Sequence, residues 1–175
     1  MGRYFTAEQI SLAGRSFRQA ERMAGQFFRL DPPEWKGHRY DVKTLAYLNK
    51  HEVREGAFAH LCKYEYGEEP EPQGGGIHFY RICLQDDRIL DAIERAHSFI
   101  RLSPLLLYIA AHELVHVIRF DRGEGDFDAS EAEKSGEEEK VHRITRNLLK
   151  PMNDTDLNLV MDCFSSRYQI CDMVQ

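Results

Sequence analysis

The first part of the chain alternates apolar and polar residues with the period of an amphipathic helix. Residues 6–9 (Thr-Ala-Glu-Gln) have the pattern of a capping box, which opens helices, and Asp31-Pro32-Pro33 is a segment at which a helix ends. We therefore expect one long helix between these two segments. Its buried face would consist of apolar residues at helical spacing: Ile10, Ala13, Phe17, Ala20, Ala24, Phe27 and Phe28.

The next stretch has a weaker pattern. Val42, Leu45 and Leu48 share one face of a helix, so they predict a second helical region from near residue 41 to about residue 63. Residues 67–76 are rich in Gly, Pro and Glu, which predicts a loop. We expect residues 6–66 as a whole to form a helical N-terminal part.

After this loop, the pattern predicts one strand and then helices. Residues 77–84 are rich in isoleucine and aromatic residues and are bounded by turn residues, which is typical of a strand. Helices are expected at residues 86–100, 104–119, 135–149 and 154–170. These elements predict a mainly helical α+β fold with a small sheet, in a single domain that covers residues 1–175.

The predicted helix at residues 104–119 differs from the others because it is apolar on nearly every side. Ser103 is a favourable N-cap residue and Pro104 a favourable first helical residue, so the helix is expected to begin there. A helix that is apolar all round is typically central and buried. Nevertheless, two histidines and a glutamate lie within it.

Composition narrows the class of protein. Hydrophobic residues make up 42% of the chain and charged residues 30%, as in soluble globular proteins, and the net charge is −6. Lys and Arg form no long cluster, which argues against nucleic acid as a partner. No apolar run is long enough for a membrane span or a secretory leader, so we expect a cytoplasmic protein without a membrane. The cysteines form no Cys-x-x-Cys pair and are expected to be free and mostly buried: Cys62, Cys83, Cys163 and Cys171.

Residues 112–116 read His-Glu-Leu-Val-His and carry the strongest chemical signal in the chain. On a helix, His112 and His116 lie on one face about one turn apart, where both imidazoles can bind one cation. Zinc accepts imidazole nitrogen readily, and a catalytic zinc keeps one position for water. Glu113 is expected to act as the general base on this water. The alternative is that both histidines are structural residues bonded to carbonyl groups.

A zinc site of this kind needs a third protein ligand, and the predicted helix at residues 135–149 offers acidic candidates. Val141, Ile144 and Leu148 define its inward face. Glu138 lies three residues before Val141 and is the best placed of the acidic residues at positions 137–139. Two alternatives stay open: Glu138 is only a helix cap paired with Ser135, or His142 is the third ligand.

The run at 112–116, followed by Glu138, His142 and Leu-Leu-Lys-Pro at 148–151, resembles the gluzincin class of zincin metallopeptidases, and more narrowly the ImmA/IrrE-type domains. The resemblance covers about residues 104–151. It implies that His112, His116 and Glu138 bind zinc, that Glu113 is the catalytic base and that His142 orients His112. The chain departs from the ImmA/IrrE pattern at His142, where Asn or Asp is usual, and at Lys150, where Met is usual.

Further residues have weaker signals. The acidic run at 121–139 is expected to be a solvated loop that favours basic substrates; the alternative is a calcium loop, although it lacks EF-hand spacing. The strand at 77–84 is either an edge strand that pairs with a peptide or an internal strand. Four residues are candidates for the electrophilic group that stabilises a tetrahedral intermediate: Tyr80, Tyr108, Arg143 and Arg146.

These patterns together predict a zincin-like domain with its zinc-site core at about residues 77–151 and a C-terminal helix at about 154–171. The expected function is zinc-dependent hydrolysis of peptide bonds in a protein or peptide substrate, with Glu113 activating the zinc-bound water. The first alternative is a zinc-binding regulatory or protein-interaction module without peptidase activity. The second is a helical interaction protein without a metal.

Overall fold

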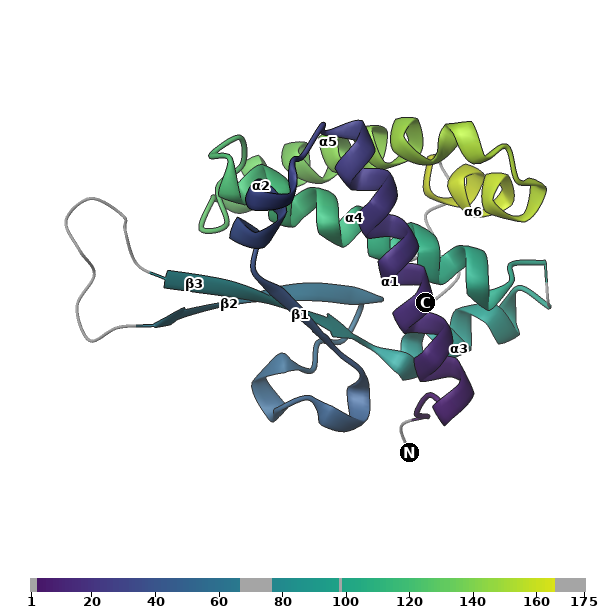
Figure 1. The fold of residues 1–175 in the computed structure, drawn as a ribbon. Helices are drawn as coiled ribbons and strands as arrows, with labels where there is room; N and C mark the ends of the chain where they lie inside the picture. Colours follow the sequence, from purple (N-terminus) through teal and green to yellow (C-terminus); the bar gives the residue numbers. More distant parts are fainter. Residues whose placement is uncertain (1–2, 67–76, 98, 166–175) are drawn as a thin grey trace.

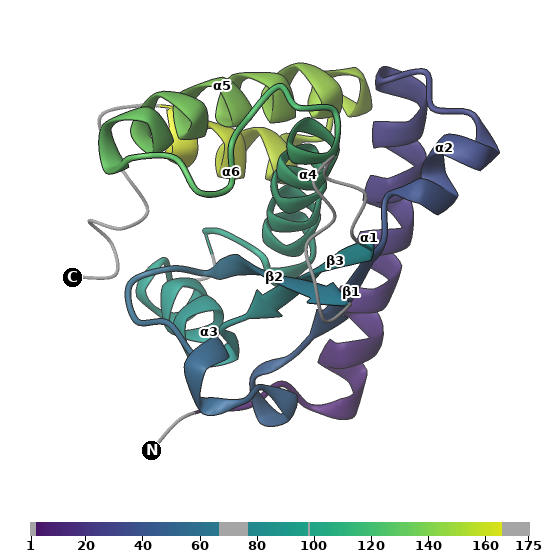
Figure 2. The ribbon, with the colours of Figure 1, turned by 90° about the vertical axis from the view of Figure 1, so that its left-hand side faces the viewer.

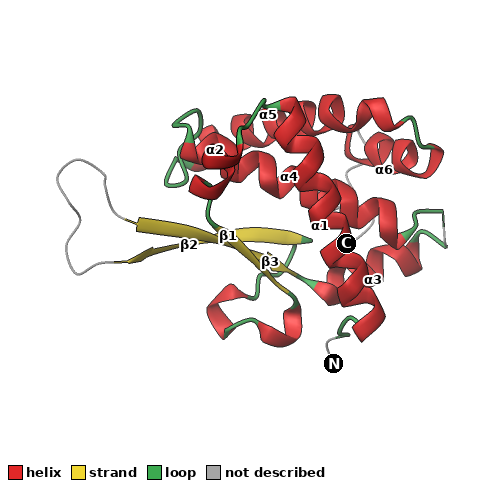
Figure 3. Ribbon diagram, viewed as in Figure 1, coloured by secondary structure: helices red, strands yellow, loops and turns green. Residues whose placement is uncertain are grey.

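The computed structural model describes residues 3–66, 77–97 and 99–165, and it has an α+β fold that is mainly helical (Figure 1). The helices form a layer on one face of a small sheet, and the two short 3-10 helices between the first two strands lie on the opposite face (Figures 1 and 3). The expected fold class is therefore confirmed at this level.

The sheet has three strands in the order β1-β3-β2: β1 (Tyr40–Lys43), β2 (Ala59–Tyr66) and β3 (Ile77–Leu84). β1 runs parallel to β3, whereas β2 is antiparallel to it. The predicted strand at 77–84 is thus confirmed, but it is the central strand. The hypothesis that it is an edge strand is wrong, because the two edges are formed by β1 and β2.

Side chains alternate across β3, as the pleat of a strand requires. Tyr80, Ile82 and Leu84 are buried, and Ile82 and Leu84 belong to the hydrophobic core under the helices. Phe79, Arg81 and Cys83 therefore lie on the other face, which we call the outer face of the sheet. Their partners on β2 also project from the outer face: Tyr64, Cys62 and His60.

The helical region expected at about residues 41–63 is wrong. This stretch contains β1, two short 3-10 helices (Leu45–Tyr47 and Lys50–Glu52) and the start of β2. Val42 pairs with Ile82 in the sheet, whereas Leu45 begins a 3-10 helix, so their helix-like spacing arises from two different elements. Pairing with β3 outweighs the local pattern here.

Helix α4 (Leu102–Asp121) is the centre of the helical layer. The other long helices pack against it: α1 (Ala7–Phe27), α5 (Glu131–Leu149) and α6 (Thr155–Ser165). Figure 2 shows α4 nearly end-on, with α5 above it and the sheet below. By length and composition α4 is apolar enough to cross a membrane, but 78% of its most apolar window is buried inside the fold. Its position in the core accounts for its apolar character.

The remaining helices are α2 (Pro32–Gly37) and α3 (Asp86–Arg95). The capping box at Thr6 is present at the start of α1, as expected. α3 is shorter than expected, because His97 has φ 49° and the backbone leaves the helix. The predicted loop at 67–76, the end of the predicted last helix after residue 165, and Cys171 lie outside the described residues.

Two helices begin earlier than expected. α4 has Arg101 as its N-cap residue, which places Ser103 and Pro104 within the first turn. Proline is tolerated there because the first amide groups of a helix have no acceptor within it. α5 begins after Ser130, whose side chain accepts a hydrogen bond from the Glu133 amide. Ser135 therefore lies inside α5.

Candidate metal centre

The middle of α4 brings three polar side chains to one buried position. His112 and His116 are 8% and 7% exposed, and Glu113 is 6% exposed. The histidines are one helical turn apart on the face toward α5, as the spacing of the motif requires. Burying these groups in an apolar helix is unfavourable unless they have polar partners.

Helix α5 supplies the partner of both histidines. The Glu138 carboxylate lies between the two imidazoles: its Oε1 atom is 2.8 Å from His116 Nε2, and its Oε2 atom is 3.2 Å from His112 Nε2. Both histidines thus direct the same ring nitrogen, Nε2, to one carboxylate. The alternative in which they bond carbonyl groups is not what the structure shows.

The charges of this cluster are strongly coupled. Burial opposes ionisation of Glu138, but the hydrogen bonds from His112 and His116 outweigh it and hold the pKa of its carboxyl well below the usual range. Burial also opposes protonation of His116, yet the pKa of its imidazole is raised because Glu138 and Glu113 lie close by. Burial raises the pKa of Glu113, so its carboxylate has a higher proton affinity than an exposed one.

The geometry of these residues fits a tetrahedral metal ion. Suitable donor atoms of His112, His116 and Glu138 all lie within 4.8 Å of one another. Nitrogen and oxygen ligands of zinc at about 2.0–2.1 Å are roughly 3.4 Å apart, only slightly farther than the distances between the imidazoles and the carboxylate. The Nδ1 atoms of both histidines are buried without a hydrogen-bond partner among the described residues. Since each Nε2 atom faces the carboxylate, the available donor set is two imidazole Nε2 atoms and one carboxylate.

His142 lies beside this cluster. Its Nδ1 atom is 2.8 Å from the Tyr108 hydroxyl oxygen, and its Nε2 atom is 3.7 Å from Glu138 Oε2. It contacts His112 through the rings, with centroids 4.4 Å apart, and makes no hydrogen bond to the unpartnered His112 Nδ1 atom. Burial and the positive charge of His112 lower the pKa of His142 to about 4. Glu138 is thus closer to both histidines than His142 is, although His142 remains within reach of the cluster.

The cap interpretation of Glu138 is wrong, because Ser130 caps α5 and Ser135 lies inside the helix. The calcium-loop interpretation is not supported either, since the carboxylates point to different partners. Asp121 contacts two histidines, Glu124 pairs with Arg119, and the Asp126 side chain accepts a hydrogen bond from the Asp128 amide.

The candidate metal cluster lies in a cleft of about 1220 Å³ between α4, α5 and β2. Residues 57–61 all border this cleft. Ala59, His60 and Leu61 begin β2, and because successive side chains of a strand alternate between its two faces, three consecutive lining residues indicate that the cleft follows the edge of β2 at its start. This edge is not paired with another described strand. Sequence reasoning missed it because residues 41–63 were expected to be helical.

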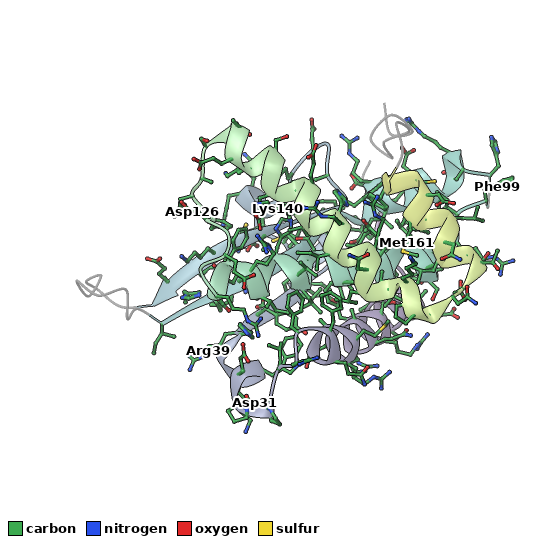
Figure 4. The ribbon with its side chains drawn as sticks, turned by 90° about the horizontal axis from the view of Figure 1, so that it is seen from above. Asp31, Arg39, Phe99, Asp126, Lys140 and Met161 are labelled. Atoms are coloured by element: carbon green, nitrogen blue, oxygen red, sulfur yellow. The ribbon has the colours of Figure 1, made fainter. Side chains whose placement is uncertain are left out.

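Charges of both signs line the cleft. Four arginines among them form no ion pair within the described part of the chain: Arg54, Arg88, Arg143 and Arg146. Near the start of α5 the lining includes Asp126, Glu131 and Lys134. Figure 4 shows Asp126 beside the first turn of α5, at the opposite end of the helical layer from Met161 on α6.

Three of the four candidate electrophilic residues lie in the cleft. Tyr108, Arg143 and Arg146 line the cleft. Tyr80 does not: it is 2% exposed and packs against Phe120 and Phe127.

Four further histidines have partners that no sequence pattern indicated. His38 Nδ1 and His78 Nε2 both lie 2.8 Å from the carboxylate of Asp121, the last residue of α4. His51 contacts the Tyr64 hydroxyl, and His60 lies near Cys62 on β2.

Comparison of the chain with protein-family models, with curated proteins and with solved structures finds no match. The argument for function therefore rests on the geometry of the site.

Proposed function

We propose that this protein is a zinc-dependent metallopeptidase, a zincin-like domain of gluzincin type. The observation that carries the proposal is the convergence of His112 Nε2 and His116 Nε2 on the Glu138 carboxylate, next to the buried Glu113. A three-ligand set of this composition is one that catalytic zinc sites use, with the fourth position left open. Zinc bound there would supply Lewis-acid polarisation of a carbonyl group and acidification of a coordinated water molecule.

Glu113 is the proposed general base. It follows His112 directly on α4 and lines the cleft. It is not one of the three clustered donors, but it lies next to them. Its raised pKa gives it more proton affinity than an exposed carboxylate has, which suits a group that takes a proton from water and passes it to the leaving amine.

The shape of the cleft favours a peptide as the substrate. The edge of β2 offers backbone amide and carbonyl groups that an extended peptide can pair with, and side chains of the peptide would then alternate between the two sides of the cleft. The four arginines without ion-pair partners favour negative charge on the part of the peptide that lies beside them. This differs from the expectation that the acidic run would favour basic substrates.

The alternative function is a zinc-binding regulatory or interaction module without hydrolysis. It uses the same three ligands, so the two functions differ only at Glu113. The Glu113→Gln substitution keeps the size of the side chain but removes the base. A peptidase would lose hydrolysis by about 10²-fold or more and retain its zinc.

The test combines metal analysis with peptide hydrolysis. We expect about one zinc per chain at this site by mass spectrometry, lost in His112→Ala/His116→Ala and kept in Glu113→Gln. Hydrolysis of a fluorogenic peptide library is expected in the wild type and in the control variant Glu133→Gln, which changes an exposed carboxylate of α5 that is not among the residues lining the cleft. Zinc binding without hydrolysis of any peptide would favour the regulatory module, and absence of zinc uptake would refute both.

A further inference from the structure

A second group of potential metal ligands projects from the outer face of the sheet, and one of its members, His60, also borders the cleft. It consists of His60 and Cys62 on β2 and Cys83 on β3, and suitable donor atoms of all three lie within 4.8 Å of one another. We propose that His60, Cys62 and Cys83 form a second zinc site, independent of the proposed catalytic function.

Strand register brings these residues together. His60 is paired directly with Cys83, and Cys62 follows two residues after His60, so all three side chains project from the same face. Cys83 is completely buried but does not belong to the hydrophobic core under the helices. Its thiol instead faces the Cys62 thiol on the outer face of the sheet.

The distances match those of zinc ligands. Cys62 Sγ and Cys83 Sγ are 3.9 Å apart, and Cys62 Sγ is 3.9 Å from His60 Nδ1. Two thiolates bound to one tetrahedral zinc at about 2.3 Å are roughly 3.8 Å apart, and a thiolate and an imidazole nitrogen slightly less. The sulfurs are therefore spaced as ligands of one ion, whereas a disulfide needs a separation of about 2.05 Å.

A backbone contact fixes the tautomer of His60 that a metal needs. His60 Nε2 lies 2.6 Å from the Glu52 carbonyl oxygen, which is only an acceptor, so Nε2 carries the proton and donates it. Nδ1, on the side of the two sulfurs, therefore has a free lone pair. A hydrogen bond from the second ring nitrogen to a carbonyl group is the usual support of a histidine that binds a metal.

The Glu52 carbonyl group is itself held in place. It also accepts a hydrogen bond from the Gln85 side chain, and the completely buried Glu52 carboxylate pairs with Arg81 at 3.1 Å. Rigid outer contacts of this kind keep ligands in position before the metal arrives.

The charges of the site also suit a divalent cation. Zinc binds the thiolate form of cysteine and the neutral form of histidine. Binding of Zn²⁺ would release both thiol protons to solvent, and the resulting two thiolates and neutral imidazole would balance the charge of the ion. Three protein ligands leave the fourth position to water, since His60 and Cys62 are only half-buried.

Cobalt(II) is a suitable probe, because thiolate ligands give it a near-ultraviolet charge-transfer absorption that the histidine and carboxylate ligands of the site on α4 do not give. Metal-free, reduced protein is titrated with Co²⁺ near neutral pH. We expect two cobalt ions per chain, and a charge-transfer band that saturates with one of them. Cys62→Ser and Cys83→Ser should each abolish the band, whereas His112→Ala/His116→Ala should keep it and lose the other cobalt.

Cys163→Ser is the matched control, because Cys163 is a half-buried free cysteine on α6, far along the chain from this cluster. Retention of one cobalt on α4 and an unchanged circular dichroism spectrum show that a serine variant is folded; if Cys83→Ser fails to fold, Cys62→Ser alone decides. Two results would overturn the proposal. One is the absence of a charge-transfer band in wild-type protein whose thiols are shown to be reduced by alkylating a separate sample; the other is a band that persists in Cys62→Ser.

Discussion

The Glu138→Gln substitution separates a metal ligand from a residue that merely contacts two histidines. Glutamine has the same shape as glutamate but carries no charge. In the structure the Glu138 carboxylate is the group of α5 that meets both imidazole Nε2 atoms, at 2.8 Å and 3.2 Å. Its loss would leave two neutral imidazoles as the ligands supplied by α4.

The size of the effect follows from linkage between zinc binding and folding. Free zinc at a thousand times its dissociation constant stabilises the fold by about 4.1 kcal/mol. For a chain of this size, each kcal/mol of added stability raises the melting temperature by about 2–4 °C. This stabilisation therefore raises the melting temperature by about 8–16 °C. Loss of a direct ligand should weaken binding by at least the ~100-fold that loss of an outer contact can cause. The same free zinc then stabilises Glu138→Gln by about 1.4 kcal/mol, or about 3–6 °C.

The assay is thermal unfolding with and without buffered zinc, together with competition against a chromophoric chelator. Cys62→Ser is placed in the background of every variant, so that zinc on the outer face of the sheet does not contribute. Glu139→Gln serves as the control, because it makes the same chemical change one residue along α5. Zinc that stabilises Glu138→Gln as strongly as the wild type would refute the ligand role, and a large loss in His142→Ala instead would indicate a three-histidine site.

Four further predictions concern the fold and the cleft. Arg81→Ala leaves the buried Glu52 carboxylate without its cation and should cost about 3–5 kcal/mol in urea unfolding; Arg95→Ala, which removes an exposed pair with Asp91, should cost less than about 1 kcal/mol. Ala20→Leu adds volume to the fully buried face of α1 and should cost about 1–3 kcal/mol, whereas Ala132→Leu on the exposed face of α5 should be close to neutral in the same assay. Hydrogen bonds from His38 and His78 outweigh burial and lower the pKa of Asp121, so its contribution to stability is present above its unfolded pKa of about 3.9 and is lost as the pH falls through the lower folded value; stability of Asp121→Asn should depend less on pH in that acidic range, and an unchanged pH profile would contradict the assignment. Arg143→Ala/Arg146→Ala should lower kcat/KM for acidic peptides by up to about fivefold per arginine and leave neutral peptides unaffected, and an equal loss for both peptide classes would argue against electrostatic recognition.

The parts of this fold that local sequence determines were predictable. The capping box at Thr6 marks the start of α1, and the apolar run around residue 110 identifies α4 as the core helix. The pairing of His112 with His116 follows from helical geometry alone, because both residues lie on one helix. The position of Glu138 beside both histidines depends on how α5 packs on α4. The helical phase of Val141 nevertheless favoured Glu138 over the other acidic residues at positions 137–139.

Features that depend on strand register were not predictable. β1 and β2 form because β3 offers them hydrogen-bonding partners, and β1 lies far from β3 in the sequence. Without that register, the juxtaposition of His60 with Cys83 cannot be inferred from their positions in the chain. The period-two alternation of His60, Cys62 and Tyr64 was a signal for a strand, but the preceding leucines at helical spacing obscured it.

The open edge of β2 has a consequence for solubility. A strand edge with unpaired backbone groups is a template for any other strand, including one from a second copy of the same chain, and natural proteins protect such edges against aggregation. Here the edge lies inside a cleft whose other wall is α5. A single extended chain can enter such a cleft, whereas the edge of a whole sheet would collide with the helix. α5 therefore carries Glu138, the proposed third ligand, and also shields this part of the edge from association with another sheet.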